Sequence, residues 1–349
     1  MATSTVKSWF GKKGFSLRSM RELFMTKKDV EAAAAVPVRV AINLCSNTSP
    51  ALKRAVQDAF FSSSETGLLH VAEVVPGARL RISPAADFAL ILAPEDIERT
   101  TPAAQAAAAW AAAGVPVAVL GTAQSVLVDI ETQASLALAK RGAFSESNEF
   151  VLKTFCTDGT KEGASLAHLA KWMVDTSDKT IALGTNWEFL RGSACKKIIM
   201  RAALANVAVG GINIIPGADF PLMAINQVQM AMKIATMYGY EISLERIPEA
   251  LFIMLSGLTM RGIAKGLTAP IKHGKFIIKG ALGFGGTWAV GEALVQRFER
   301  GQTIDAVLDE MGTHSKEALE KVSDTVITKF GELAGGLLEV EPGAIYKVR

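Results

Sequence analysis

Short apolar runs alternate with mixed stretches over residues 36–176. The apolar runs at 38–44 and 87–92 predict buried strands, and further strands are predicted at 68–75, 78–82, 115–120 and 150–155. The stretches between them predict helices, at 50–61, 102–113, 130–140 and 161–174, the first with Ser49 as its N-cap before Pro50. Alternating strands and helices predict a mostly parallel sheet with helices on both faces.

The pattern changes after Thr180. An amphipathic connector at 180–191 leads to residues 202–232, in which Asp219 is the only formal charge. Pro216 lacks an amide donor and Gly217 relaxes the chain, so these residues predict the corner of a helical hairpin. Each arm is shorter than the roughly 20 apolar residues that span a bilayer. The hairpin is therefore a buried core element, a re-entrant element or half of a paired insertion.

Two further apolar helices are predicted at 247–260 and 280–293, followed by a polar helical region at 302–334 and a tail at 335–349. Between the two apolar helices lies a basic segment that includes Lys272 and Lys275, and Lys196 and Lys197 precede the hairpin. Positive charges beside apolar segments favour an anionic lipid surface, and a solvated loop of a soluble helical domain is the alternative. The glycines of 280–293 allow close helix packing.

The N-terminal segment 1–35 is basic and amphipathic and ends in a short alanine linker at 31–35. Lys12, Lys13 and Arg18 lie among aromatic and aliphatic residues, a composition that suits the interface of an anionic membrane. A basic tail without fixed structure and an organelle transit peptide are the alternatives. Basic residues interrupt every apolar run, so no secretory signal is predicted.

The run from Ala194 to about Asp309 resembles the YcjF-like, GTPase-associated helical family of unknown function. The motifs that carry the resemblance are the Ile-Pro-Gly-Ala-Asp turn, a following Gln and Met, a Tyr-Gly pair and a Phe-Glu-Arg-Gly close, at Ile215–Asp219, Gln227, Met230, Tyr238-Gly239 and Phe298–Gly301. Members of this family occur beside or fused to Era-type GTPases and are often membrane proteins. The resemblance implies a cellular context close to GTPases and membranes, and it assigns no reaction to the chain.

The preceding domain resembles a degenerate Era-type GTPase, in the order of its elements and in the loop 159–163 with the helix after it. A GTPase needs GxxxxGK[ST] after its first strand, because backbone amides and a lysine hold the phosphates there. Residues 45–53 contain no glycine, and Lys53 falls within the predicted helix. Residues 121–124, where a guanine-reading carboxylate is expected, are Gly-Thr-Ala-Gln. We therefore expect no ordinary nucleotide hydrolysis.

The amino-acid composition further limits the classes of protein to which the chain could belong. Of 349 residues, half are hydrophobic and 20% are charged, and the mean hydropathy is +0.27, which favours membrane contact or heavily buried helices. The net charge of +3 is too small to indicate nucleic acid. Three separated cysteines predict neither a zinc site nor a disulfide framework, and the four histidines lack the spacing of a catalytic set.

Single residues in the hairpin have two interpretations each. Asp219 either contacts an ion or a lipid headgroup or caps the helix that begins near Pro221. Gln227 either donates a hydrogen bond across helices or is simply packed or exposed. Pro216, Gly217, Tyr238 and Gly239 are candidate structural or interaction residues.

The sequence therefore predicts an α/β domain at 36–176 and a helical domain at 177–334 that contacts the cytoplasmic face of a membrane. We expect a non-enzymatic scaffold without cofactor, metal or nucleic acid. The alternatives are a soluble cytoplasmic oligomer or partner of a GTPase, and a residual nucleotide-binding switch.

Overall fold

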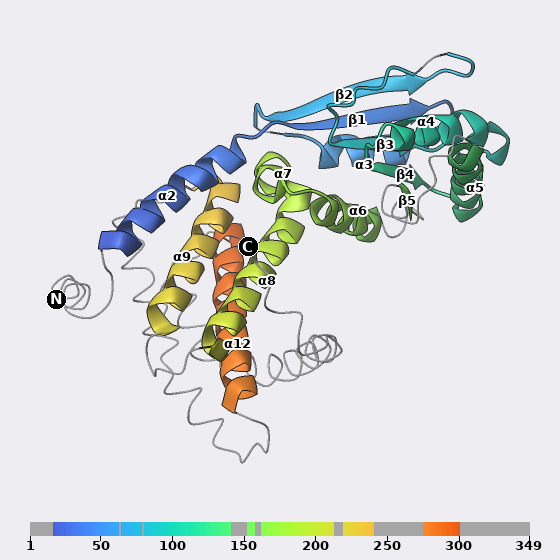
Figure 1. Ribbon diagram of the computed structural model, residues 1–349. Coiled ribbons are helices and arrows are strands. Elements are labelled where there is room, and N and C mark those ends of the chain that lie inside the picture. The colour runs from blue at the N-terminus through green and yellow to red at the C-terminus, as the bar shows by residue number, and fades with distance from the viewer. Residues whose placement is uncertain are drawn as a thin grey trace. The chain divides into compact units, whose positions relative to one another are not determined.

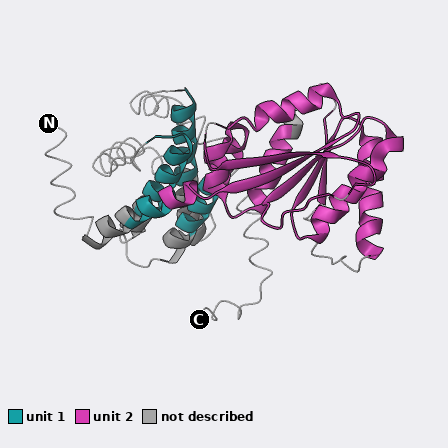
Figure 2. Cartoon of the chain, turned by 90° about the horizontal axis from the view of Figure 1, so that it is seen from above, with its two compact units in different colours: residues 1–30, 198–349 teal, residues 31–197 magenta. Residues whose placement is uncertain are grey.

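The computed structural model describes residues 17–62, 64–78, 80–140, 152–157, 162–212, 219–240 and 275–300. The chain divides into two compact units (Figure 2). One unit, called here the sheet unit, comprises residues 31–197, and the other, called the helical unit, comprises residues 1–30 and 198–349.

The sheet unit is built on five parallel strands, β1 Val38–Cys45, β2 Gly67–Val74, β3 Phe88–Leu92, β4 Val117–Gly121 and β5 Leu152–Cys156 (Figure 1). Their order in the sheet is β2-β1-β3-β4-β5. This is the 2-1-3-4-5 order of doubly wound α/β sheets of the flavodoxin type. The predicted α/β class is therefore confirmed at the level of a parallel sheet with helices.

The helices of this unit follow the strands, with α3 at Pro50–Ala59, η2 at Ile97–Arg99, α4 at Thr100–Ala112, α5 at Gln124–Lys140, α6 at Glu162–Thr176 and α7 at Thr180–Asn186. One face of the sheet packs against α4 and α5, where alanines of α4 let the helix approach closely around the buried Trp110. On the other face, Phe88 of β3 contacts Trp172 of α6, with ring centroids 5.7 Å apart. Every residue of β3 and β4 is buried, as expected for central parallel strands.

The predicted strand at 78–82 is wrong for the described part of that range. Ala78 and residues 80–82 have no strand conformation, and among described residues the chain passes from β2 to β3 without a helix. Leu80 and Ile82 pack against the α4 side of the core, so their apolar character reflects burial on the face of the sheet. β2 is also parallel to β1, which excludes a two-stranded turn-back at this point.

Two boundaries differ from the sequence prediction. The predicted linker at 31–35 is mostly helical, because α2 runs from Leu17 to Ala34 and alanine has the highest helix propensity. The predicted connector at 180–191 forms α7 and the start of α8, Glu188–Ile212. Trp187 is fully buried there and its ring lies 5.4 Å from that of Phe60, which explains why the sheet unit extends to Lys197.

In the helical unit, the later part of α8 lies beside α9, Asp219–Met237, and α12, Lys275–Arg300 (Figure 1). Ala203 of α8 and Phe284 of α12 are buried together, with Met200, Val207 and Trp288 packed against them. Among the residues that the structure describes, no helix combines the length and the apolar character that crossing a bilayer requires. The predicted helices at 247–260 and 302–334 lie outside the described residues.

Candidate functional site

Doubly wound sheets bind ligands outside the carboxyl ends of their strands, where the strand order reverses. In this sheet the reversal lies between β1 and β3, which are neighbours in the order. The loop after β1, residues 46–49, and the loop after β3, residues 93–96, therefore form the edge at which a sheet of this kind would bind a phosphate or another ligand.

The two loops are joined to each other. Thr48 is buried, and its hydroxyl lies 2.8 Å from the carbonyl oxygen of Cys45 and 3.0 Å from that of Leu92. Asn47 has a positive φ of 59°, a conformation that asparagine tolerates, and its side-chain amide donates to Asp96 Oδ2 at 2.6 Å. The amide of Glu95 donates to the carbonyl oxygen of Asn47 at 3.0 Å. The side chains of Asn47 and Thr48 and the amide of Glu95 are thus engaged between the two loops.

The start of α3 is a poor anion site. Pro50 is its first residue and has no amide hydrogen, so one of the donors at a helix N-terminus is missing. Ser49 occupies the N-cap position as predicted, but its side chain makes no capping hydrogen bond. The carboxylate of Asp96 lies within hydrogen-bond distance of Asn47 and disfavours a phosphate there, although Arg99 Nε lies 3.8 Å from it and offsets part of its charge. Lys53 lies in α3 and is exposed, as the sequence predicts.

The end of β4 is closed by packing. A Cβ atom on Gly121 would lie 3.0 Å from Leu127 Cδ2 and 3.2 Å from Ala93 Cβ. The carbonyl oxygen of Gly121 accepts the amide of Thr157 at 2.7 Å. In α5, the carboxylate of Asp129 accepts hydrogen bonds from Thr100 and Gln133. These contacts tie the described groups at the end of β4 and in α5 to one another.

Cys45, the last residue of β1, is a buried thiol at this edge. Burial raises the pKa of the Cys45 thiol from 9.0 to about 12. The unfolded chain loses this proton near pH 9 while the folded chain keeps it, so the stability tied to it is complete below pH 9 and is lost as pH rises toward 12.

We therefore expect the free energy of unfolding to fall by about 1.4 kcal/mol per pH unit through this thiol above its unfolded pKa. Urea unfolding of the unmodified chain and of Cys45→Ala at a series of alkaline pH values measures it. The difference between the two slopes isolates Cys45 from other alkaline groups. Equal slopes would contradict the assignment.

A second set of buried polar groups lies in the helical unit. Asn206 of α8 donates to Thr287 Oγ1 of α12 at 2.7 Å, and Asn226 of α9 donates to Asn206 Oδ1 at 2.8 Å. Gln227 also donates to Thr287 Oγ1, at 3.4 Å, so the hydrogen bond across helices considered for it is present. Asn206 and Thr287 are fully buried. This set, called here the polar junction, connects α8, α9 and α12.

The Tyr-Gly pair ends α9. Gly239 has a positive φ of 75°, and the amide of Tyr240 donates to the carbonyl oxygen of Ala235 at 3.0 Å, the pattern of a Schellman cap. Tyr238 packs on Phe298 of α12, with centroids 5.6 Å apart, and its hydroxyl lies 3.0 Å from Glu299 Oε1. The geometry therefore gives this pair a structural role at the end of the helix.

The other predicted residues lie at the start of a helix, within α2, or outside the described residues. Asp219 is the first residue of α9, which begins two residues before Pro221. Arg18 lies in α2 and Lys275 is the first residue of α12. The remaining predicted residues, Pro216, Gly217, Lys12, Lys13 and Lys272, lie outside the described residues.

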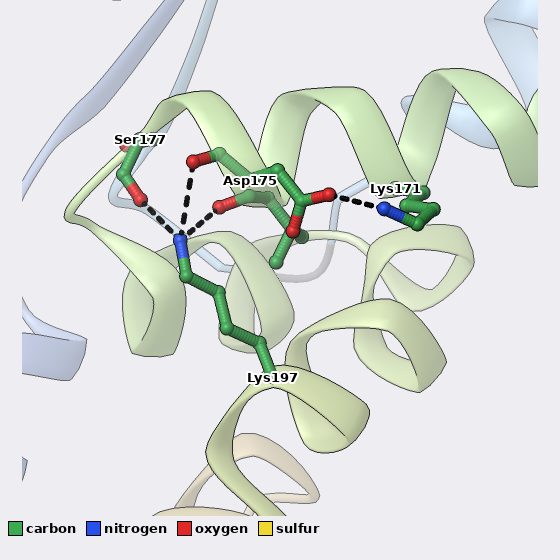
Figure 3. Close-up of polar contacts among 5 residues, drawn as sticks. Lys171, Asp175, Ser177 and Lys197 are labelled. Atoms are coloured by element: carbon green, nitrogen blue, oxygen red, sulfur yellow. Dashed lines mark hydrogen bonds and ion pairs between the residues drawn. The ribbon is translucent and has the colours of Figure 1, made fainter. Parts of the chain in front are cut away.

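Lys197 has a role that the sequence did not indicate. Its ammonium group donates to three carbonyl oxygens at the C-terminal end of α6, those of Val174, Asp175 and Ser177, at 2.5, 3.4 and 3.1 Å (Figure 3). A lysine in this position satisfies carbonyl groups that have no helical partner and interacts favourably with the helix dipole. Lys197 therefore ties the first half of α8 to the end of α6 within the sheet unit.

Lys197→Ala is expected to destabilise the sheet unit by about 1–2 kcal/mol, because three charge-assisted hydrogen bonds to carbonyl groups are lost. Lys196→Ala is the matched control, since Lys196 is exposed on the same turn, and its effect should stay within about 0.5 kcal/mol. Urea unfolding followed by circular dichroism compares the two. The assignment fails if both variants unfold at the same urea concentration.

Comparison with known proteins does not assign the chain to a family. No protein family, no curated protein and no solved structure matches the chain. Among the described residues, no group of three or more histidine, cysteine, aspartate or glutamate side chains could hold a metal ion. The resemblances to YcjF-like and Era-type proteins remain predictions.

Proposed function

We propose that the protein is a non-enzymatic, membrane-associated scaffold whose sheet unit binds other macromolecules and no nucleotide. The observation that carries this proposal is the joined pair of loops after β1 and β3. The side chains of Asn47 and Thr48 donate hydrogen bonds to Asp96 and to the carbonyl oxygen of Leu92, which joins the two loops. Asp96 adds a carboxylate beside the loop after β1, with Arg99 Nε 3.8 Å away. A degenerate GTPase-like domain used as a binding platform fits these contacts.

The membrane part of the proposal rests on charge and hydropathy. The first 30 residues hold seven lysines and arginines against two acids, among aromatic and aliphatic side chains. Residues 202–232 contain one formal charge. A basic amphipathic segment, together with an apolar helical domain similar to that of the YcjF-like family, would attach the chain to the cytoplasmic face of a membrane.

The second candidate is a soluble scaffold that forms an oligomer or binds a partner GTPase. The polar junction is consistent with it, because Asn206, Thr287 and Gln227 pair their polar groups inside the helical unit and leave the packing of the three helices self-contained. A residual nucleotide-binding switch is a third candidate, and it would require the loops after β1 and β3 to separate.

Fractionation of cells that express the full chain tests membrane association. We expect the protein in the membrane pellet, with release by alkaline carbonate distinguishing surface attachment from insertion, and release by high salt pointing to the basic surface. Recovery in the soluble fraction from the outset would favour the second candidate.

A charge-matched pair of variants shows which surface is responsible. The triple variant Lys12→Gln, Lys13→Gln, Arg18→Gln should release the protein from the pellet at lower salt than the unmodified chain. The control Lys53→Gln, Arg54→Gln, Lys196→Gln removes the same charge from exposed positions of the sheet unit. Equal effects of the two variants would mean that net charge alone is responsible.

A further inference from the structure

The outer edge of β2 carries backbone groups that no strand of this chain pairs among the described residues. Val38 lies opposite Gly67, and its amide donates to the carbonyl oxygen of Thr66 at 2.9 Å. In a parallel ladder, successive residues of an edge strand point their backbone groups alternately toward the neighbouring strand and away from it. This hydrogen bond therefore directs the amides and carbonyls of residues 66, 68, 70 and 72 toward β1. Those of Gly67, Leu69, Val71 and Glu73 therefore point away from the sheet.

The side chains of this edge are apolar and exposed. Leu68, Leu69 and Val71 are 43%, 41% and 56% exposed, whereas the residues of the opposite edge strand β5 are all half-buried. The cause is visible in the connection from β2 to β3, which contains no helix among its described residues to cover β2 (Figure 1). Phe61 and Val75 extend the exposed apolar surface at the two ends of the strand.

We propose that this edge binds a second copy of the chain, with β2 of one copy antiparallel to β2 of the other. A two-fold axis perpendicular to the sheet joins the two five-stranded sheets into one. Such an axis keeps corresponding faces together, so opposed residue numbers must add to an even sum. The register is therefore restricted to a few choices.

Apolar and charged positions select one register. With His70 opposite His70 of the second copy, Leu69 lies opposite Val71 on the same face, and both carry outward backbone groups that can exchange hydrogen bonds. Glu73 then lies opposite Gly67, which has no side chain to oppose its charge. A shift of one pair in one direction places Glu73 opposite Leu69, and a shift in the other places it opposite Glu65, so both are less favourable.

The contact is small. A stable protein interface buries about 1,600 Å² in total, and a single eight-residue strand contributes less. We therefore infer a weak dimer whose population rises with concentration, such as a scaffold crowded on a surface would provide. This inference names the partner of the proposed scaffold and rests on that function, but its test uses neither nucleotide nor membrane binding.

Disulfide cross-linking of the full chain tests the register. In the proposed pairing, residue 70 faces its own copy in a pair without hydrogen bonds, with Cα atoms about 4.5 Å apart, which suits a disulfide. His70→Cys should give a reducible covalent dimer on mild oxidation. Leu136→Cys is the matched control, because Leu136 on α5 is 57% exposed, as Val71 is at 56%, and lies away from β2. The unmodified chain measures the background of its three native cysteines.

Sedimentation velocity at increasing concentration tests the association itself. We expect Val71→Lys to weaken it by on the order of tenfold or more, while Leu136→Lys leaves it unchanged. The proposal is overturned if the chain stays monomeric without excess cross-linking, or if Val71→Lys associates like the unmodified chain. It is also overturned if the chain is monomeric and Val71→Lys loses a different co-purifying protein, which would assign the edge to a strand from that partner.

Discussion

Gly291→Ala is expected to destabilise the helical unit by about 1–3 kcal/mol. A Cβ atom at this position of α12 would lie 2.5, 2.8 and 2.8 Å from three side-chain carbons of Ile199 on α8. Ile199 is fully buried and β-branched, so its side chain has few other rotamers to adopt. The clash therefore separates α12 from α8, and the helix propensity gained with alanine offsets only part of the cost.

Gly286→Ala is the matched control on the same helix, because a Cβ atom there meets nothing within 4 Å. It should be neutral or stabilise the chain by up to about 1 kcal/mol through helix propensity. Urea unfolding followed by circular dichroism compares the two variants, and Ile199→Ala combined with Gly291→Ala should recover part of the loss. Equal unfolding curves for the two glycine variants would contradict the packing of α8 against α12.

Asn206→Leu is expected to cost about 2–3 kcal/mol, because it breaks the polar junction at a fully buried position. The side chains of Asn226 and Thr287 each lose the hydrogen bond that Asn206 supplies. Thr287 keeps the Gln227 amide at 3.4 Å, so the cost comes from the two lost Asn206 hydrogen bonds at a fully buried position. The effect should exceed that of Gln229→Leu, since Gln229 is half-buried and its amide donates to the Thr26 hydroxyl at 3.2 Å.

A double substitution separates loss of a hydrogen bond from loss of packing. Asn206→Leu combined with Thr287→Val removes both partners of the 2.7 Å contact and should be less destabilising than the sum of the single changes. Guanidinium unfolding of the four chains completes the cycle. If Asn206→Leu alone is neutral or stabilising, the polar junction does not hold the three helices in register.

The central strands could be predicted from the sequence because burial on both faces produces an uninterrupted apolar run. The strands predicted at 87–92 and 115–120 therefore agree with β3 and β4 to within two residues at each end. The strand predicted at 78–82 is wrong for its described residues, where Leu80 and Ile82 are apolar because they pack on a face of the sheet outside any strand. An apolar run reports burial and does not distinguish a paired strand from an irregular segment.

Contacts between distant residues were harder to predict. The sequence indicated that Lys197 was one of several cations beside an apolar segment, and its contact with the carbonyls at the end of α6 depends on the turn between two helices. Asn206 and Thr287 could have been noticed as polar residues within apolar runs, but their pairing is tertiary. Gly286 and Gly291 are both glycines within one apolar helical run, so the sequence gives no reason to treat them differently. The position of Ile199 next to Gly291 distinguishes them in the structure.

Direct titration of the full chain with fluorescent guanine and adenine nucleotides, in the presence of Mg²⁺, tests the central claim most directly. The joined loops after β1 and β3 and the carboxylate of Asp96 predict no saturable binding at physiological nucleotide concentrations. Saturable binding that is lost when the β1–α3 loop is altered, for example by Thr48→Val, would contradict the account and make the sheet unit a nucleotide switch.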